Sequence, residues 1–259
     1  MWNDSKSLNV ISGCLLALVV LMLLGAGLSW IAQRPMFALH TIQIEASAGV
    51  PLRHINLATV RSTALPQIRG NFFSVNLESV RQAFEALPWM HKAAVRREWP
   101  DQIIVTLEEH QPLATWGDEG RLVSIKGDVF TANLDEAEED GELPVLSGPT
   151  GSEKEVVSRF AEVNQWLIPL QLEAEAVTLT DRYAWHIRLD NGITVDLGTE
   201  QDKSTLRNRM TRLIAIYPQL VAHLKQSIES VDMRYPNGVA LKVAGLNNSA
   251  LAAKNEKKK

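Results

Sequence analysis

The predicted fold of this chain depends most on residues 87–116, LPWMHKAAVRREWPDQIIVTLEEHQPLATW. The stretch contains the end of a helix, a strand over residues 91–97, a turn at residues 99–101 and a strand over residues 102–110. In the second strand, Ile103, Val105 and Leu107 recur every second residue, which is the period of a strand with one buried face. Pro100 fixes φ in the turn, so the two strands form a hairpin that leads into a further module.

The residues before this hairpin supply a strand and two helices. Residues 37–45 alternate in polarity and predict a strand, and residues 52–68 predict a short helix. Asn76 is a typical N-cap for a second helix, which Pro88 stops. The apolar face of that helix is formed by Leu77, Val80, Ala83, Phe84 and Leu87. The predicted order is therefore strand, helix, helix, strand, strand.

An apolar segment near the N-terminus predicts a membrane helix. Residues 8–32 contain no charged side chain, and about twenty apolar residues in a helix cross a hydrocarbon core of roughly 30 Å. Trp2 and Trp30 lie near its two ends, where indole rings favour the membrane interface. The alternative is a cleavable signal peptide, whose apolar region is typically shorter than this one. We favour a signal anchor, and in both cases the C-terminal bulk is exported.

After residue 112 the pattern changes to a strand-rich second module. Short strands are predicted at residues 113–116, 122–125 and 129–131, and the acidic residues 135–142 predict a solvated loop. Residues 153–170 are amphipathic and predict a helix. Ser152 is its predicted N-cap, with Glu155 completing a capping box.

The second half of this module begins with the strongest hairpin pattern in the chain, over residues 184–197. Asn191-Gly192 predicts a two-residue type I′ turn, in which both residues have φ > 0. Residues 203–224 predict a long helix with a kink or an early stop at Pro218. Strands follow at residues 227–235 and 239–243. We therefore expect an α+β fold, in which the second module is a mixed β domain with an antiparallel sheet and two packing helices.

Neither the composition nor the motifs indicate catalysis. The net charge of −4 over 259 residues argues against a nucleic-acid-binding protein. The six histidines lack metal-ligand spacing, and there is no nucleophile-elbow, phosphate-loop or dinucleotide motif. Cys14 is the only cysteine and lies in the apolar segment. We expect a non-enzymatic protein without metal, cofactor or small-molecule substrate, whose surfaces bind other proteins.

Several motifs resemble a known family. The β-α-α-β-β order after a membrane anchor resembles a POTRA domain. LPWM with VRREWPDQI, ATW followed by SIKGDVF, and VDMRYPNG resemble the FtsQ/DivIB family of bacterial cell-division proteins over nearly the whole chain. We accordingly expect a cytoplasmic tail (1–7), a transmembrane helix (8–32), a POTRA domain (37–111), a β domain (112–245) and a disordered basic tail (246–259).

The resemblance also implies partners and their contact residues. It implies a single-pass type II protein of the inner membrane, periplasmic in its C-terminal domains, at the division septum. The partner FtsB would add a segment beside the last strand, and FtsL would join through FtsB. By position, the contacts are Arg182 (or the neighbouring Tyr183), Arg234, Tyr235, Asn237, Gly238, Val239 and Leu241. A second surface, for other division proteins, is Lys92, Val95 and Arg97. Pro236 departs from the family pattern, and a proline cannot donate a backbone hydrogen bond.

Two other classes of protein share part of this pattern. A POTRA-type chaperone or docking component of a secretion or envelope-assembly system would continue into a membrane β-barrel of many amphipathic strands. The residues after Val243 contain no such strands. A membrane-anchored cell-wall enzyme would need a pocket with convergent ionisable groups, and the sequence shows no cluster of that kind. We therefore expect a division scaffold.

Overall fold

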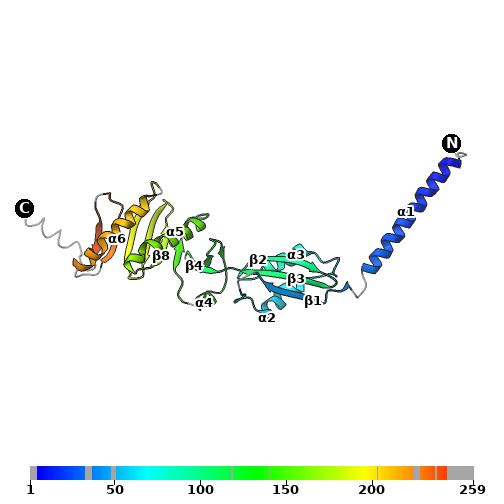
Figure 1. Cartoon of the computed structure of the whole chain (residues 1–259), viewed down its shortest axis with the longest axis horizontal. Helices are drawn as coiled ribbons and strands as arrows, with labels where there is room; N and C mark the ends of the chain where they lie inside the picture. Colours follow the sequence, from blue (N-terminus) through cyan, green and yellow to red (C-terminus); the bar gives the residue numbers. More distant parts are fainter. Residues whose placement is uncertain are drawn as a thin grey trace, which may run out of the picture. The chain divides into compact units, whose positions relative to one another are not determined.

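The computed structural model describes residues 5–32, 37–47, 51–117, 119–139, 141–202, 204–223, 228–236 and 238–243. The chain divides into two compact units, Met1–His110 and Gln111–Lys259. Figure 1 shows the chain and labels several of its helices and strands. The expected basic tail and the first four residues of the expected N-terminal tail lie outside the described residues.

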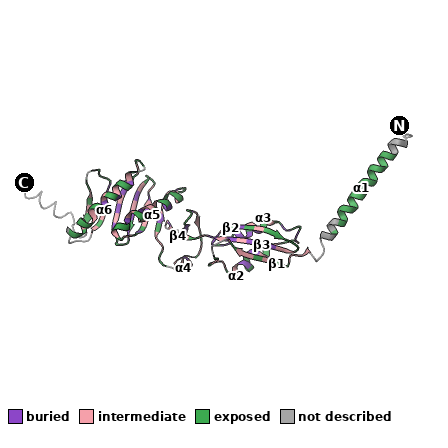
Figure 2. Cartoon of the chain, in the orientation of Figure 1, coloured by how far each residue is buried: buried purple, intermediate pink, exposed green. Residues whose placement is uncertain are grey.

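The chain begins with one long helix, α1 (Ser5–Ala32). Its described side chains are exposed, including those of many leucines and valines (Figure 2). Of the helices in the described residues, it is the one that is long and apolar enough to cross a membrane. A row of exposed large apolar side chains is typical of a helix that lies in hydrocarbon rather than in water.

The rest of the first unit has the predicted strand, helix, helix, strand, strand order. Its elements are β1 (Thr41–Ala46), α2 (Leu57–Thr59), the π-helical η2 (Val60–Ala64), the 3₁₀ turn η3 (Leu65–Gln67), α3 (Leu77–Glu85), β2 (Met90–Glu98) and β3 (Gln102–Glu109). The predicted first helix is therefore one irregular helical segment rather than a regular α-helix. The strands form a sheet in the order β1-β3-β2, with β1 parallel and β2 antiparallel to β3.

The core of the first unit follows from the alternation along β3. Ile103, Val105 and Leu107 are fully buried against the helices. Ile104, on the other face, is also buried, so this face is not wholly solvated. The turn between β2 and β3 lies at the predicted place and contains a cis peptide bond before Pro100.

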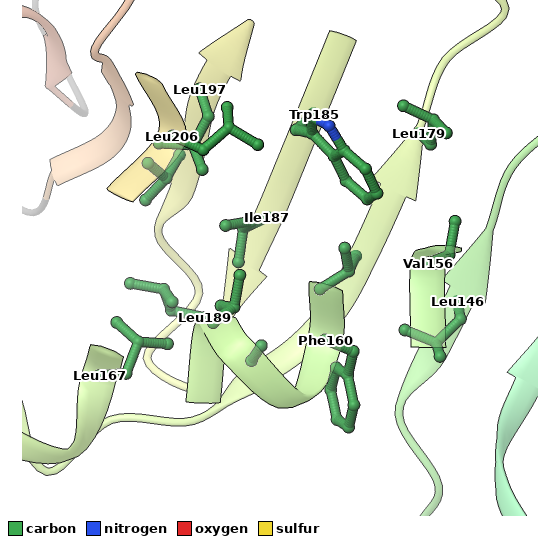
Figure 3. Packing of buried hydrophobic residues seen from close by; sticks show 14 of the residues in the cluster. Leu146, Val156, Phe160, Leu167, Leu179, Trp185, Ile187, Leu189, Leu197 and Leu206 are labelled. Atoms are coloured by element: carbon green, nitrogen blue, oxygen red, sulfur yellow. The ribbon is translucent and has the colours of Figure 1, made fainter. Parts of the chain in front are cut away.

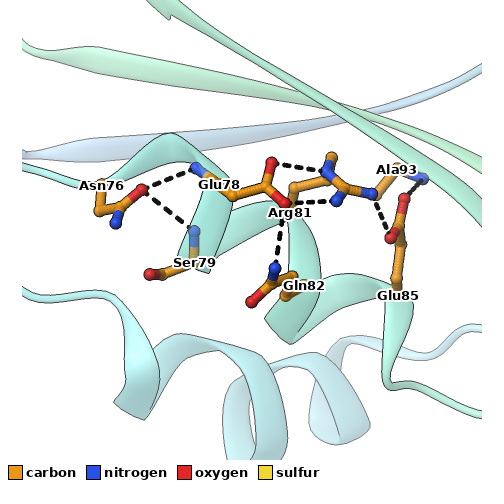
Figure 4. Close-up of polar contacts among 7 residues, drawn as sticks. All are labelled: Asn76, Glu78, Ser79, Arg81, Gln82, Glu85 and Ala93. Carbon is orange, nitrogen blue, oxygen red and sulfur yellow. Dashed lines mark hydrogen bonds and ion pairs between the residues drawn. The ribbon is translucent and has the colours of Figure 1, made fainter.

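Helix α3 is fixed at both ends by polar contacts (Figure 4). As predicted, Asn76 caps it, because the side-chain Oδ1 accepts hydrogen bonds from the backbone N–H of Glu78 at 3.0 Å and of Ser79 at 3.3 Å. Near its C-terminus, Glu85 Oε1 accepts from the backbone N–H of Ala93 in β2 at 3.3 Å. Arg81 pairs with Glu85 as well as with Glu78. The helix therefore has a defined start and a fixed attachment to the sheet.

The second unit is built around one large sheet. Its strands are β4 (Pro112–Trp116), β5 (Arg121–Ser124), β6 (Val129–Phe130), β7 (Val145–Ser147), β8 (Ala174–Leu179), β9 (Ala184–Leu189), β10 (Thr194–Thr199), β11 (Ile228–Asp232) and β12 (Ala240–Val243). Its helical segments are α4 (Leu134–Ala137), α5 (Glu153–Leu167), the 3₁₀ turn η4 (Ile168–Leu170) and α6 (Thr205–His223). In the described residues the sheet order is β12-β11-β10-β9-β8-β7-β4-β5-β6.

The predicted antiparallel pairs β9–β10 and β11–β12 are present, but the sheet also contains parallel pairs. β10 pairs with β11, β7 with β8 and β4 with β7 in parallel. Two of these pairs have a helix in their connection, α6 between β10 and β11 and α5 between β7 and β8. A parallel neighbour requires a crossover connection, and an amphipathic helix is the usual one. Each predicted helix was thus also evidence for a parallel pair.

Both long helices contribute to one apolar cluster with the sheet (Figure 3). Val156 and Phe160 of α5 and Leu206 of α6 share this cluster with Trp185 and Leu197 of the sheet. Along the strands, His186, Arg188 and Asp196 alternate with the buried residues and are less buried. The sheet therefore has one face covered by helices and one polar face, which is a common arrangement for sheets with antiparallel pairs.

Two local predictions around β9 are corrected by the structure. Strand β8 was not predicted, because Glu175 and a register shift near Ala176 interrupt its apolar alternation. The turn after β9 is not type I′, since φ is positive at Gly192 but not at Asn191. The Gly192 N–H bonds the Leu189 carbonyl at 2.8 Å, and the Leu189 N–H bonds the Ile193 carbonyl at 2.9 Å. This is a three-residue loop with glycine in the left-handed position.

Three predictions about helix ends also change. The Ser152 hydroxyl donates to the Pro149 carbonyl at 2.6 Å and does not cap α5, so the predicted capping box is wrong. Helix α6 continues through Pro218 to His223, so it does not stop early. Just before the acidic stretch expected to be a solvated loop, Asn133 caps the short helix α4, which extends into that stretch; the Asn133 side chain accepts from the Asp135 N–H at 3.1 Å.

Candidate functional site at the β12 edge

Strand β12 is the outermost strand at one end of the large sheet. It pairs antiparallel with β11, placing Leu241 opposite Val231 and Ala240 opposite Asp232. Leu241 is half-buried and packs against the core, whereas Ala240 and Lys242 are exposed. Among the described residues, no strand pairs with the outer side of β12. Its outward backbone N–H and C=O groups are thus a template on which another strand can pair.

An open pocket of about 370 Å³ lies where the chain enters this strand. Its lining residues are Tyr235, Pro236, Gly238, Val239 and Ala240. Tyr235 is 55% exposed, which leaves its ring accessible at the pocket. Three predicted contact residues therefore surround one hollow, while the predicted Asn237 lies outside the described residues.

Arg212 of α6 holds the loop that forms this pocket. Its Nη2 donates to the carbonyl oxygens of Met233 at 2.9 Å and Tyr235 at 2.8 Å, and its Nη1 donates to that of Pro236. Charged donors form the stronger class of hydrogen bonds, and the planar guanidinium presents its N–H groups in a fixed fork. No pattern in the sequence indicates this contact, because its acceptors are backbone carbonyls more than twenty residues away.

Arg234 is held over the sheet by Asp232 and by a glycine. Its Nε donates to Asp232 Oδ1 at 2.9 Å and its Nη2 to Oδ2 at 2.6 Å. A Cβ at Gly198, where φ is +71°, would come within 2.8 Å of the Arg234 Cγ. Only glycine fits that backbone conformation and that approach without strain. Arg234 is thus pre-positioned next to the pocket, with its outer N–H groups toward solvent.

Arg182 lies at the same end of the sheet. It is exposed in the turn between β8 and β9, and the neighbouring Tyr183 has φ of +56°. β9 begins opposite the end of β10, and β10 runs parallel to β11. The turn and the loop after β11 therefore lie at one end of the sheet, about 10 Å apart by two strand spacings. The structure brings the two predicted arginines to one side of the unit.

The comparisons with known proteins identify the family. Residues 114–234 match the family "Cell division protein FtsQ/DivIB, C-terminal", and residues 50–110 match "POTRA domain, FtsQ-type". The chain is 46% identical over 246 residues to the cell division protein FtsQ of Burkholderia pseudomallei, covering 95% of this chain and 96% of that protein. The chain belongs to the FtsQ family of cell division proteins.

Other FtsQ proteins match over a similar extent. The one from Bordetella pertussis is 37% identical over 258 residues, covering 95% of this chain and 94% of that protein. The one from Neisseria gonorrhoeae is 30% identical over 244 residues, covering 94% of this chain and 96% of that protein. The expected resemblance and α+β fold class are thereby confirmed, and the first unit contains a POTRA domain. Family membership and the single apolar α1 together suggest a bitopic membrane protein of the division machinery.

The residues predicted as a second surface on the POTRA domain do not share one face. In a strand, successive side chains point to opposite sides, so Lys92 points away from the side to which Val95 and Arg97 point. Val95 packs against the core. Arg97 donates from Nε to the Phe72 carbonyl and from Nη2 to the Val75 carbonyl, both at 2.8 Å. Of the three, Arg97 and Val95 have clear structural roles, and Lys92 is an exposed side chain.

The histidines are less scattered than the sequence indicated. The rings of His91 and His110 lie 4.8 Å apart between centroids, and His54 stacks on Trp89 at 3.9 Å. On the polar face of the large sheet, His186 Nδ1 pairs with Asp196 Oδ1 across neighbouring strands. Pairings between residues on different strands depend on strand register, which spacing along the sequence does not reveal.

The Asp232–Arg234 pair gives a prediction about acid stability. The hydrogen bonds from Arg234 lower the pKa of the Asp232 carboxyl, with burial opposing them. A lowered folded-state pKa stabilises the fold above the unfolded value, near 3.9, and this contribution is lost as the pH falls through the folded value. We expect Asp232→Asn to destabilise the second unit at neutral pH, and to do so less at pH about 3, which is below the unfolded value. The measurement is a denaturant titration of both proteins at the two pH values.

A double-mutant cycle with Arg234→Gln provides the control. The coupling energy between the two positions should be present at neutral pH and smaller in acid. An Asp232→Asn effect that is equal at both pH values would assign the loss to packing rather than to the charged pair.

Proposed function

We propose that this protein is a non-enzymatic scaffold of the divisome that binds FtsB through the β12 edge, and FtsL through FtsB. In this proposal, α1 anchors the chain in the inner membrane, with the N-terminus in the cytoplasm and both units in the periplasm at the septum. The single observation that supports it most is an outer strand whose entry carries an accessible tyrosine pocket. The coarser role, in cell division, rests on family membership.

The proposed binding mode is β-strand addition. An incoming segment would pair with the outer side of β12, and main-chain hydrogen bonds would supply affinity while pockets for side chains supply specificity. Tyr235 is suited to the second role, because exposed tyrosines in such pockets are frequent hot spots of protein interfaces. Pro236 lies in the loop before the strand and outside β12, so the paired segment itself retains its backbone donors.

The charges around the edge favour an acidic partner segment. Arg234 uses Nε and Nη2 on Asp232, which leaves donors of the same guanidinium for a carboxylate of the partner. Arg182 is exposed at the same end of the sheet. Complementary charge at the rim of an interface mainly sets specificity and association rate rather than raw affinity. We therefore assign affinity to β12 and Tyr235, and selection of the partner to the arginines.

A second docking role for the POTRA domain remains part of the proposal. Lys92 is its best-placed member among the predicted residues, because its side chain is exposed on the strand β2. Other division proteins would bind there or through the membrane segment. Charge reversal at Lys92 should reduce their recruitment without affecting FtsB.

The test is affinity capture of FtsB and FtsL by the full chain from native membranes. We expect Tyr235→Ala to reduce FtsB recovery by at least about tenfold, since a hot-spot truncation costs 2 kcal/mol or more. Backbone N–H groups alternate between the two sides of a strand, so of Ala240→Pro and Leu241→Pro one removes an outward donor. That variant should lose FtsB while β12 stays paired with β11.

Ile168→Ala is the matched control, because Ile168 is an exposed large apolar residue of the same unit. It lies in η4, just before β8 begins, and β8 ends at the turn that carries Arg182. Its replacement should leave FtsB recovery unchanged. Normal capture by a folded Tyr235→Ala protein, or equal losses in all variants, would refute binding at this edge.

A further inference from the structure

Four aromatic rings gather at one end of the POTRA domain. The ring centroids of Phe37 and Phe73 lie 5.0 Å apart, those of Phe72 and Trp99 5.8 Å, and those of Phe37 and Trp99 6.0 Å. Phe72 is buried and anchors the group. Phe73 and Trp99 are 50% and 67% exposed, so the group presents two large rings outward. We call Phe37, Phe73 and Trp99 the aromatic patch.

The loop that carries Phe73 is held in one conformation. Asn71 Oδ1 accepts hydrogen bonds from the backbone N–H of Phe73 at 3.0 Å and of Ser74 at 2.9 Å. The Phe72 N–H donates to the Phe37 carbonyl at 2.9 Å. The Arg97 guanidinium donates to the carbonyls of Phe72 and Val75, which precede and follow Phe73 in the chain. A loop tied in this way cannot fold Phe73 inward to hide it. The exposed ring is therefore a fixed feature of the domain.

The position of the patch in the chain limits its distance from α1. Phe37 follows the last residue of α1, Ala32, after residues 33–36. A chain of that length spans at most about 18 Å, whatever its conformation. Phe72, Phe73 and Trp99 are attached to Phe37 by ring contacts and by the backbone bond described above. If α1 crosses a bilayer, the whole patch stays near the surface of that bilayer.

We propose that the aromatic patch binds the lipid surface of the membrane that α1 spans, and so fixes how the POTRA domain stands on it. The inference rests on the proposed membrane anchoring by α1. Tryptophan and other aromatic rings favour the membrane–water interface, where an apolar ring meets the head groups. Because the chain tethers the patch close to the surface, its effective concentration there is high and a weak intrinsic affinity suffices.

A lipid occupant explains the composition of the patch better than a protein partner. The exposed members are rings on two connections, the loop at Asn71 and the β2–β3 turn, and they lie at an end of the sheet rather than along a strand edge. Arg69 and Arg97 are exposed beside the same connections and are of the charge that lipid phosphates attract.

The test replaces Phe73 with the photoreactive p-benzoylphenylalanine in the full chain. The chain is reconstituted into vesicles of phosphatidylethanolamine and phosphatidylglycerol and irradiated, and adducts are mapped by mass spectrometry. Leu21 in α1 and Ile168 in the second unit receive the same residue as internal and distant references; both are exposed. We expect lipid adducts at positions 21 and 73, several-fold above those at 168. Trp99→Gln should lower the adduct at 73 several-fold.

The references separate the two proposals. Adducts at position 21 but at background level at 73 overturn lipid binding by the patch and leave the anchor intact. Background levels at position 21 as well overturn the anchor, and lipid binding with it. Irradiation of native membranes adds a further outcome: if position 73 crosslinks to a polypeptide instead of lipid, the patch is a protein-docking surface and the inference is wrong.

Discussion

Replacing Arg212 with methionine should destabilise the second unit by about 3 kcal/mol and weaken FtsB capture with it. Arg212 donates to three carbonyl oxygens of the loop after β11, and methionine retains the apolar stem but none of these donors. A hydrogen bond to a charged group contributes roughly 1.5–3 kcal/mol. The expected loss is smaller than the summed energy of three such bonds. Arg212 Nε is buried without a hydrogen-bond partner among the described residues, and methionine removes that unfavourable group as well.

The loss should be visible locally as well as globally. Hydrogen exchange of the full chain should accelerate in residues 233–236, three of whose carbonyls the arginine holds, and in the following residues 238–243, before it does so in β9 or β10. Arg207→Met is the matched control, since Arg207 is an exposed arginine of the same helix. The hydrogen-exchange rates of the Arg212→Lys protein should fall between those of the Arg212→Met and Arg207→Met proteins, because one ammonium group cannot reproduce the planar fork. Unchanged exchange in the Arg212→Met protein would show that the loop holds its shape without this contact.

The order of elements in both units could be predicted largely from periodicity. The alternation of Ile103, Val105 and Leu107 and the cap at Asn76 are local signals, and the structure confirms both. Strand direction was not local information. The mixed sheet follows from helices that connect neighbouring strands, so predicting it required knowledge of which strands are adjacent.

The candidate site was predicted only in part, for a related physical reason. The exposed side chains at Arg182, Arg234 and Tyr235 could be proposed from a family resemblance. The contacts that hold these residues could not be predicted, because they come from distant elements. Arg212 in α6 bonds the Tyr235 carbonyl, and Gly198 in β10 leaves room for the Arg234 side chain. Outside the site, one buried polar contact did have a signal in the sequence: Glu109 continues the inward series of β3, where an acidic residue is out of place unless it has buried partners.

Glu109 leads to the second large effect, a loss on the order of 4 kcal/mol in the POTRA domain on replacement by alanine. Its side chain is only 4% exposed. Its two carboxylate oxygens accept backbone hydrogen bonds from Arg53 at 2.9 Å, His54 at 3.2 Å and Ile55 at 2.8 Å. Alanine would leave these part-buried N–H groups without their acceptor, and an unsatisfied group costs about 1–3 kcal/mol where it is buried. Thermal unfolding of the full chain measures the loss.

Glu109→Gln distinguishes the charge from the shape of this contact. Glutamine keeps one acceptor oxygen at nearly the same position but brings an NH₂ group toward backbone donors. We therefore expect it to destabilise the domain less than alanine, yet clearly more than Glu108→Gln, whose side chain lies on the other face of β3. Hydrogen exchange at residues 53–55 should rise in the same order. If Glu109→Ala exchanged and unfolded like the natural sequence, the segment before α2 would be held by the stacking of His54 on Trp89 rather than by the carboxylate.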